Sequence, residues 1–219
     1  MANYLYLDIE TIPIQDETKC KELVANAKPP ANYKNEDTIA KWREENAANA
    51  IAKTSFDGGL GHICQICAIH GDSEARLGMQ SIDQEKSILS TFAEFATNMP
   101  DYNGFNPVIV GHNINAFDIR FIWQRAVVLG VKLPKWFPKD PKPWGNDTFD
   151  TMIAWAGSRG MVSLDNLAKY LGLEGKTGVD GSMVAQMWAD GKHDEIAAYC
   201  MDDVLLTKAI HERMMDAGL

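Results

Sequence analysis

Long apolar segments are missing from this sequence, since no run approaches the roughly 18 residues of a membrane-spanning helix. The N-terminus enters a predicted strand within about three residues, which is not the pattern of a signal peptide. Cysteine is scarce, with 4 among 219 residues, and this excludes the disulfide framework of small secreted proteins. Neither internal repeats nor low-complexity tracts occur. We therefore expect a reduced, cytoplasmic protein with no membrane contact.

An excess of positive charge is missing as well, because 30 acidic and 21 basic residues give a formal net charge of −9. A protein that binds nucleic acid through bulk charge would carry the opposite sign. An enzyme that brings divalent cations to a phosphate is still compatible with this charge, because the cations supply the local positive charge. The length suits one α/β domain with an insertion, and we expect residues 1–219 to form a single domain.

The first segment with a clear pattern is Tyr-Leu-Tyr-Leu-Asp-Ile-Glu-Thr, residues 4–11, which predicts a strand that a turn follows at Pro13. Asp8 and Glu10 lie two positions apart, so a strand places both side chains on the same face. Two such acids repel each other, and a divalent cation is the simplest compensation. Asp-x-Glu at the end of a strand is also common without any metal, so the pair needs support from the rest of the chain.

After this strand, residues 16–56 predict an insertion of two polar helices separated by two prolines. Helices of this kind usually lie on a surface or cover a cleft. Beyond the insertion, strands are predicted at 62–70, 75–80 and 107–111, and helices at 82–98, 118–129, 150–157, 163–171, 181–190 and 194–215. This order predicts an α/β fold around a mixed sheet.

Asp118 opens a predicted helix directly after the short buried strand 107–111 and close to Asn113. A carboxylate there lies at the edge of the sheet, where α/β proteins place ligands. An acid in the first turn of a helix is also frequent for purely structural reasons.

Tyr199 and Asp203 lie four positions apart in the last predicted helix, so the phenol and the carboxylate share one helical face. An exposed Tyr–Asp pair on an amphipathic helix is the alternative interpretation. Asp202 lies near the same face, and we expect it to be more exposed than Asp203.

These three segments together resemble the DEDDy branch of the DnaQ-like 3′–5′ exonucleases. The first motif of that family is matched by Asp8-Ile9-Glu10, the second by residues 113–118 with Phe117 as its aromatic, and the third by residues 199–203. The likeness is greatest to stand-alone exonucleases related to the proofreading domain of family B DNA polymerases. It implies an α/β, ribonuclease H-like fold, with a mixed five-stranded sheet flanked by helices and a helical insertion after the first strand. The insertion and the acidic net charge depart from the family pattern and leave the substrate open.

The resemblance also implies a cofactor of two Mg²⁺ or Mn²⁺ ions. Asp8 would bridge both ions, and Glu10 and Asp203 would complete the first. Asp118 would hold the second ion, largely through water. The charge balance agrees with this arrangement, because about four positive charges would offset four converging carboxylates.

By the same resemblance, the reaction is hydrolysis of phosphodiester bonds from the 3′ end of DNA, in single-stranded form, with release of nucleoside 5′-monophosphates. Tyr199 is expected to orient the attacking water, because a free tyrosine has a pKa near 10 and is poorly suited to act as a base at neutral pH. The backbone at Thr11 and Ile12 is expected to contact the terminal nucleotide, and Asn113 is a further expected substrate contact.

Two other functions remain open. An exoribonuclease is possible because no motif reads the 2′-hydroxyl, and a non-catalytic nucleic-acid-binding module could share the fold. The sequence contains no polymerase segment, so proofreading would require a separate polymerase or repair partner.

Two further patterns have competing interpretations. Cys64 and Cys67 have zinc-like spacing, but no second pair exists, and we expect buried core cysteines. Residues 131–144 interleave four lysines with three aromatic residues, a pattern typical of single-strand binding. The alternative is a proline-rich loop whose aromatic side chains pack on the core.

Overall fold

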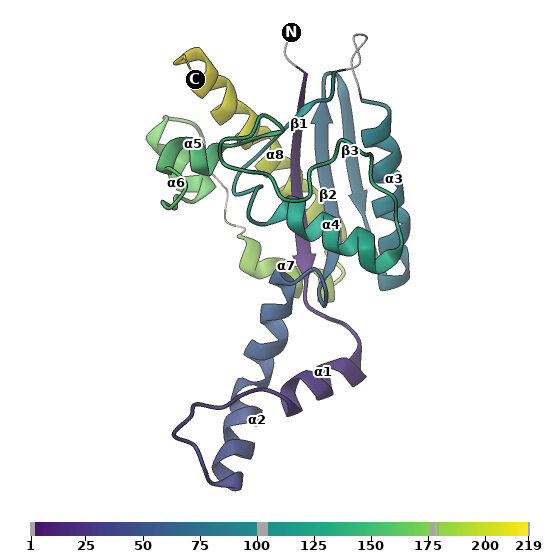
Figure 1. The fold of residues 1–219 in the computed structure, drawn as a ribbon, viewed down its shortest axis with the longest axis vertical. Helices are drawn as coiled ribbons and strands as arrows, with labels where there is room; N and C mark the ends of the chain where they lie inside the picture. The colour runs from purple at the N-terminus through teal and green to yellow at the C-terminus, as the bar shows by residue number, and fades with distance from the viewer. Residues whose placement is uncertain (1–2, 100–104, 176–177, 179, 219) are drawn as a thin grey trace.

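The computed structural model describes residues 3–99, 105–175, 178 and 180–218. Its centre is a five-stranded sheet with the order β3-β2-β1-β4-β5 (Figure 1). The strands are β1 (Tyr4–Ile12), β2 (His62–His70), β3 (Ser73–Gly78), β4 (Val108–Gly111) and β5 (Thr148–Asp150). β1, β2 and β3 pair antiparallel, whereas β4 and β5 run parallel to β1. This mixed sheet with flanking helices confirms the predicted ribonuclease H-like α/β fold.

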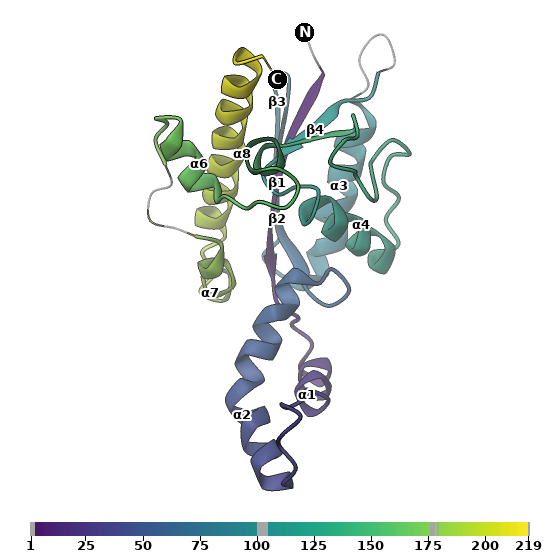
Figure 2. The same ribbon diagram turned by 60° about the vertical axis from the view of Figure 1, so that its left-hand side comes forward.

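The helices lie on both faces of the sheet. The helical segments are α1 (Glu17–Ala25), α2 (Glu36–Ala52), η1 (Lys53–Phe56), η2 (Ile82–Gln84), α3 (Glu85–Thr97), α4 (Asp118–Leu129), α5 (Thr151–Ala156), α6 (Leu164–Tyr170), η3 (Gly181–Met183), α7 (Val184–Ala189) and α8 (His193–Asp216). Figure 2 shows α8 on one side of the sheet and α3 and α4 on the other. No helix among the described residues is both long and apolar enough to cross a membrane.

The alternation of side chains along β1 supplies both faces of the sheet. Leu5, Leu7 and Ile9 belong to the larger core cluster, which α3 and α4 cover. Tyr6 points to the other face, where it joins Val204 of α8. From Tyr4 to Glu10 the even-numbered residues of β1 therefore face α8, and this places the two acids of the strand on the α8 side.

β5 is the strand that the residue pattern did not indicate. It has only three residues, and its register places Ile109, Val110 and Gly111 beside Thr148, Phe149 and Asp150. A segment this short carries no periodicity that could be recognised in the sequence.

The predicted insertion forms a helical arm, residues 16–56, that projects away from the sheet (Figure 1). Neither α1 nor α2 contains a buried residue. Both begin with a side-chain cap, because Asp16 and Asn35 each accept hydrogen bonds from two backbone amides of the following turn. Arg43 of α2 donates to the backbone oxygen of Ala27, just beyond the end of α1.

A buried ion pair joins α3 to α4. Two guanidinium nitrogens of Arg125 donate to the two carboxylate oxygens of Glu85 over 2.7 and 2.6 Å. The backbone amide of Ile63 also donates to Glu85, and His62 lies 2.8 Å from its other oxygen. Burial alone would raise the pKa of Glu85, but the hydrogen bonds from His62 and Arg125 outweigh it and lower this pKa.

Candidate active site

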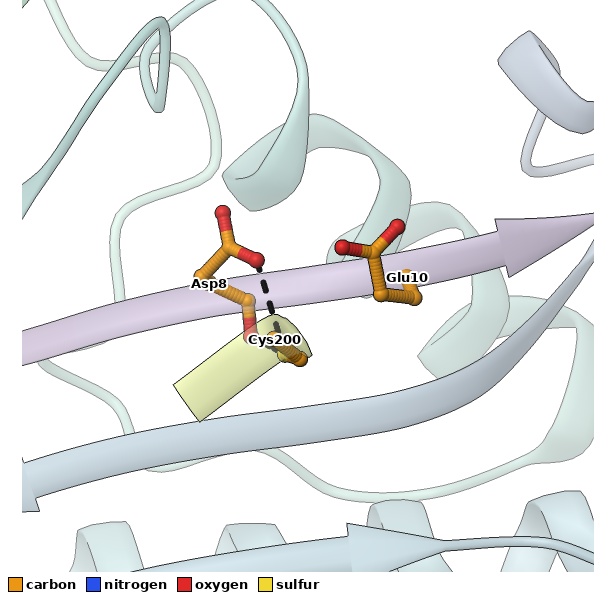
Figure 3. Close-up of side chains that lie close together, drawn as sticks. All are labelled: Asp8, Glu10 and Cys200. Carbon is orange, nitrogen blue, oxygen red and sulfur yellow. Dashed lines mark hydrogen bonds between the residues drawn. The ribbon is translucent and has the colours of Figure 1, made fainter. Parts of the chain in front are cut away.

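The two acids of β1 lie side by side in the middle of the sheet. Figure 3 shows the carboxylates of Asp8 and Glu10 on the same side of the strand, with Cys200 of α8 beside them. These three residues can bring ligand atoms within 4.8 Å of one another. Immediately after Glu10 the pairing of β1 with β2 shifts by one residue, so that Thr11 pairs with Ile63. Such an irregularity bends a strand locally and is frequent next to active sites.

Asp118 comes to these acids from the start of α4. It is the first residue of α4 and is buried. Its Oδ1 accepts a hydrogen bond of 3.1 Å from the backbone amide of Ile9, which lies between the two acids of the strand. Burial, together with the negative charges of Asp150 and Asp203, raises the pKa of Asp118 to about 7. Hydrogen bonds from backbone amides act in the opposite direction but are weaker.

Tyr199 and Asp203 reach the same place from α8. Both are buried, whereas Asp202 between them is exposed, as expected from the sequence. The interpretation of this motif as an exposed pair is therefore wrong. Burial and the charges of Asp203 and Glu10 raise the pKa of Tyr199 far above its usual value. The phenol consequently keeps its proton at neutral pH in the structure as it stands.

The three other acids of the site all act on the pKa of Asp8. Burial raises the pKa of Asp8 well above its usual range, and the charges of Asp118, Glu10 and Asp203 raise it further, in that order. Each of these three groups is a carboxylate from one of the predicted motifs. Protons or cations must offset such a cluster, and carboxylate oxygens are the donors that Mg²⁺ and Mn²⁺ prefer. The side chains present therefore fit hard divalent ions.

Asp150 is a supporting residue beside the site that the sequence pattern did not reveal. Its buried carboxylate accepts hydrogen bonds from the backbone amides of Asn113 and Asn115, over 3.0 and 3.1 Å. It also caps α5 by accepting from two backbone amides of that helix. Asn113 has a φ of 60°, the only positive value at a described residue other than glycine. Asp150 thus holds the strained loop that presents Asp118.

His112, next to this loop, is engaged elsewhere. Its Nδ1 lies 2.9 Å from the hydroxyl of Thr151, and its Nε2 lies 2.8 Å from the backbone oxygen of Val162. These bonds fasten the start of the loop to α5 and to the segment before α6. We assign His112 a structural role.

Cys200 is a second residue whose contact with the site was not indicated by any sequence motif. Its buried thiol donates toward the backbone oxygen and Oδ2 of Asp8, over 3.6 and 3.4 Å. Cys67 of β2 lies beside Cys200 and contacts the backbone oxygen of Ala197. Cys64 and Cys67 are both buried, so the expectation of core cysteines is confirmed.

The predicted substrate contacts differ in accessibility. Thr11 is partly exposed, and its hydroxyl donates to the backbone oxygen of Ser55 over 2.8 Å. The side chain of Ile12 is fully buried in the core, so only its backbone is left for a substrate. Asn113 is half-buried and lines a cavity of about 420 Å³ together with Met161 and Tyr170.

The loop 131–144 mostly agrees with the second interpretation, a loop whose aromatic side chains pack on the core. Phe137 is buried, and its ring lies 6.0 Å from that of Phe92 in an edge-to-face contact. Trp136 packs on the same core cluster. Trp144 alone among the three aromatic residues of the loop is exposed, with 82% of its surface accessible. Phe137 is thus unavailable for stacking on bases, and Trp136 is partly covered by the core.

The chain matches a known protein family over most of its length. The family described as predicted 3′–5′ exonucleases related to the exonuclease domain of PolB matches residues 57–217. The matched range contains Asp118, Tyr199 and Asp203, whereas β1 and the helical arm precede it. No curated protein matched the sequence. Because the match covers more than half of the chain, the chain belongs to this family.

Proposed function

We propose that this member of the family is a metal-dependent 3′–5′ exonuclease that hydrolyses single-stranded DNA and releases nucleoside 5′-monophosphates. The observation that carries the proposal is the convergence of Asp8, Glu10, Asp118 and Asp203 with Tyr199 in one site. These residues come from three segments far apart in the sequence, and each one matches a position of the family motifs.

The four carboxylates would hold two Mg²⁺ or Mn²⁺ ions. Asp8 is the natural shared ligand, because the three other acids all act on its pKa. The bond from Ile9 to Asp118 holds one of the two Asp118 oxygens toward β1. When bound, the ions would lower the pKa of a water molecule and offset the charge that develops on the phosphate.

Tyr199 would position the attacking water rather than remove its proton. A tyrosine with its usual pKa near 10 is protonated at neutral pH, so the oxygen can accept a hydrogen bond while the hydroxyl donates one. Removal of a proton by this phenol at neutral pH would require the opposite shift of its pKa. The phenol lies on the same face of α8 as Asp203, next to the acids that would hold the metal.

Degradation of a 5′-labelled oligonucleotide tests the reaction, its polarity and its substrate at once. The labelled strand should be presented as single-stranded DNA, as duplex DNA and as RNA of the same sequence, with Mg²⁺, with Mn²⁺ and with EDTA. We expect a metal-dependent ladder that shortens from the 3′ end and forms fastest on single-stranded DNA.

Each outcome of this experiment has a defined meaning. Faster degradation of RNA would replace the DNA assignment by an exoribonuclease. Internal cuts would contradict the exonuclease mechanism. Absence of cleavage on all three substrates, with metal demonstrably bound, would favour a non-catalytic nucleic-acid-binding module.

A further inference from the structure

Phe56 is an exposed aromatic residue at the point where the helical arm meets the sheet. It is the last residue of η1, and 74% of its surface is accessible. Its ring lies 6.1 Å from that of Phe117, with an angle of 60° between the ring planes. Phe117 in turn contacts Phe121 of α4 at 5.6 Å. The three rings form a row. It runs from the buried ring of Phe121 on α4, through Phe117, to the exposed ring of Phe56.

The backbone beneath Phe56 is firmly held, although its ring is exposed. The buried hydroxyl of Thr54 accepts a hydrogen bond of 2.9 Å from the backbone amide of Ile14. The backbone oxygen of Ser55 accepts one of 2.8 Å from the hydroxyl of Thr11. An apolar ring in solvent on a fixed backbone contributes little to the stability of the fold, yet it is pre-organised to bind a flat apolar group.

The position of Phe56 connects it with the candidate active site from two sides. Through Ser55 it is tied to Thr11, the residue that follows Glu10. Through its ring it contacts Phe117, the residue that precedes Asp118. Phe56 is therefore linked by direct contacts to the sequence neighbours of both Glu10 and Asp118.

The charge of the protein favours stacking as the means of holding such a strand. With a formal net charge of −9 and an acidic site, bulk attraction of phosphates is weak. Stacking of a base on an aromatic ring does not depend on that charge, and it tolerates every base because each has a π-face.

We propose that Phe56 is a stacking platform for a base within the last two nucleotides of the substrate strand, with Phe117 as its support. This inference rests on the proposed exonuclease function. Phe56 belongs to the arm and directly precedes residue 57, where the family match begins.

A set of single variants tests the platform. Phe56→Ala removes the ring, Phe56→Trp keeps an aromatic face, and Phe105→Ala is the matched control. Phe105 is 68% accessible and precedes β4, whereas the loop that carries Phe117 follows the other end of that strand. On single-stranded DNA we expect Phe56→Ala to raise KM about tenfold and to leave kcat within about twofold. Phe56→Trp should restore KM, and Phe105→Ala should leave it unchanged.

An abasic site in the substrate identifies the stacked base. In the wild-type protein, an abasic site at the terminal or the next position should weaken binding about tenfold, measured by fluorescence anisotropy in EDTA so that no turnover occurs. In Phe56→Ala the same abasic site should leave the binding affinity almost unchanged, because the ring on which the base would stack is already absent. Equal unfolding temperatures of all variants would show that the fold is intact.

Three results would overturn the platform. KM of Phe56→Ala could equal that of the wild type, the abasic penalty could persist in that variant, or kcat could fall while KM stays constant. The last result would mean that the ring acts on Asp118 through Phe117 instead of binding a base. If the wild-type protein hydrolyses DNA in these cases, the proposed function stands and the platform alone fails. If it hydrolyses no nucleic acid, the proposed function itself fails.

Discussion

The protein contains two regions that are held together in different ways: the helical arm, and the remainder built around the sheet, which we call the sheet region. In the sheet region, β1 and β2 are buried along most of their length. In the arm, no residue of α1 or α2 is buried, and polar side chains cap the start of both helices. Contacts between distant segments therefore stabilise the sheet region, whereas local hydrogen bonds and the pairing of α1 with α2 hold the arm. All four acids of the site belong to the sheet region, so similar changes in the two regions should have different consequences.

The largest effect is expected where a buried and an exposed acid are neighbours on α8. Asp203→Asn should reduce the hydrolysis of single-stranded DNA at least about 10³-fold, because loss of a metal-holding carboxylate costs several kcal/mol of transition-state stabilisation. Asp202→Asn changes the exposed neighbour and should leave the rate within about twofold. Initial rates on a labelled oligomer measure both. Loss of activity in Asp202→Asn, with activity retained in Asp203→Asn, would exchange the roles of these two residues.

The next comparison uses one arginine from each region. Arg125→Ala should lower the free energy of unfolding by about 3–5 kcal/mol, because it leaves the buried carboxylate of Glu85 without its partner. Arg43→Ala in the arm removes one hydrogen bond to Ala27 and should cost less than about 1 kcal/mol. Urea unfolding followed by tryptophan fluorescence gives both values. Similar losses for the two variants would contradict the distinction between the regions.

Two helix caps extend the comparison to local structure. Asp150→Ala should lower the free energy of unfolding by roughly 2–4 kcal/mol. The substitution removes the cap of α5 and the acceptor for the amides of Asn113 and Asn115. Hydrolysis should also slow, because the loop that presents Asp118 loses its support. Asn35→Ala removes the cap of α2. It should destabilise the arm alone, by about 1 kcal/mol.

Hydrogen exchange separates these two effects. Asp150→Ala should increase exchange in the loop after β4 and in α5, and Asn35→Ala should increase it in α2 alone. Faster exchange throughout the sheet in Asn35→Ala would show that the arm contributes to the global stability of the protein.

The smallest expected effect concerns two aspartates whose pKa values shift in opposite directions. Hydrogen bonds from the following turn lower the pKa of Asp16 in the arm, whereas burial raises the pKa of Asp118 to about 7. The folded protein thus holds a proton on Asp118 that the unfolded chain releases near pH 4. The stabilisation due to this proton is lost as the pH rises from about 4 to about 7.

The prediction is a decrease of a few degrees in the unfolding temperature of the metal-free protein between pH 5 and pH 8, relative to Asp118→Asn. The comparison with the variant is needed because the lowered pKa values of His70 and His211 act in the opposite direction below about pH 6.5. Mn²⁺ should raise the unfolding temperature more at pH 8 than at pH 5, because protons compete for the same oxygens. If the unfolding temperatures of the wild type and Asp118→Asn changed with pH in parallel, the proposed effect of the Asp118 proton on stability would be contradicted.

The sequence predicted the elements whose signals are local and periodic. The four longer strands, the last helix and the two capped arm helices all carry such signals, and the i,i+4 spacing of Tyr199 and Asp203 placed them on one face. β5 was missed because three residues carry no period.

The contacts that support the site depend on distant pairings, and sequence spacing cannot indicate them. Cys200 meets Asp8 across 192 positions, and Asp150 meets Asn113 across 37. The cap position of Asp150, before a helix that begins with Thr151, was the one local signal that could have drawn attention to it. The contact of Phe56 with Phe117 likewise depends on how the arm joins the sheet.

Calorimetric titration with Mn²⁺ tests most directly whether the four acids of the site form a metal centre. The account predicts that the wild-type protein binds Mn²⁺ more weakly as the pH falls from 8 to 6, and that Asp8→Asn abolishes this binding. It also predicts that Asp16→Asn, which changes an acid of the arm, leaves the titration unchanged. Identical titrations of the wild type and Asp8→Asn, or no binding at millimolar Mn²⁺, would contradict the assignment of a metal-dependent site.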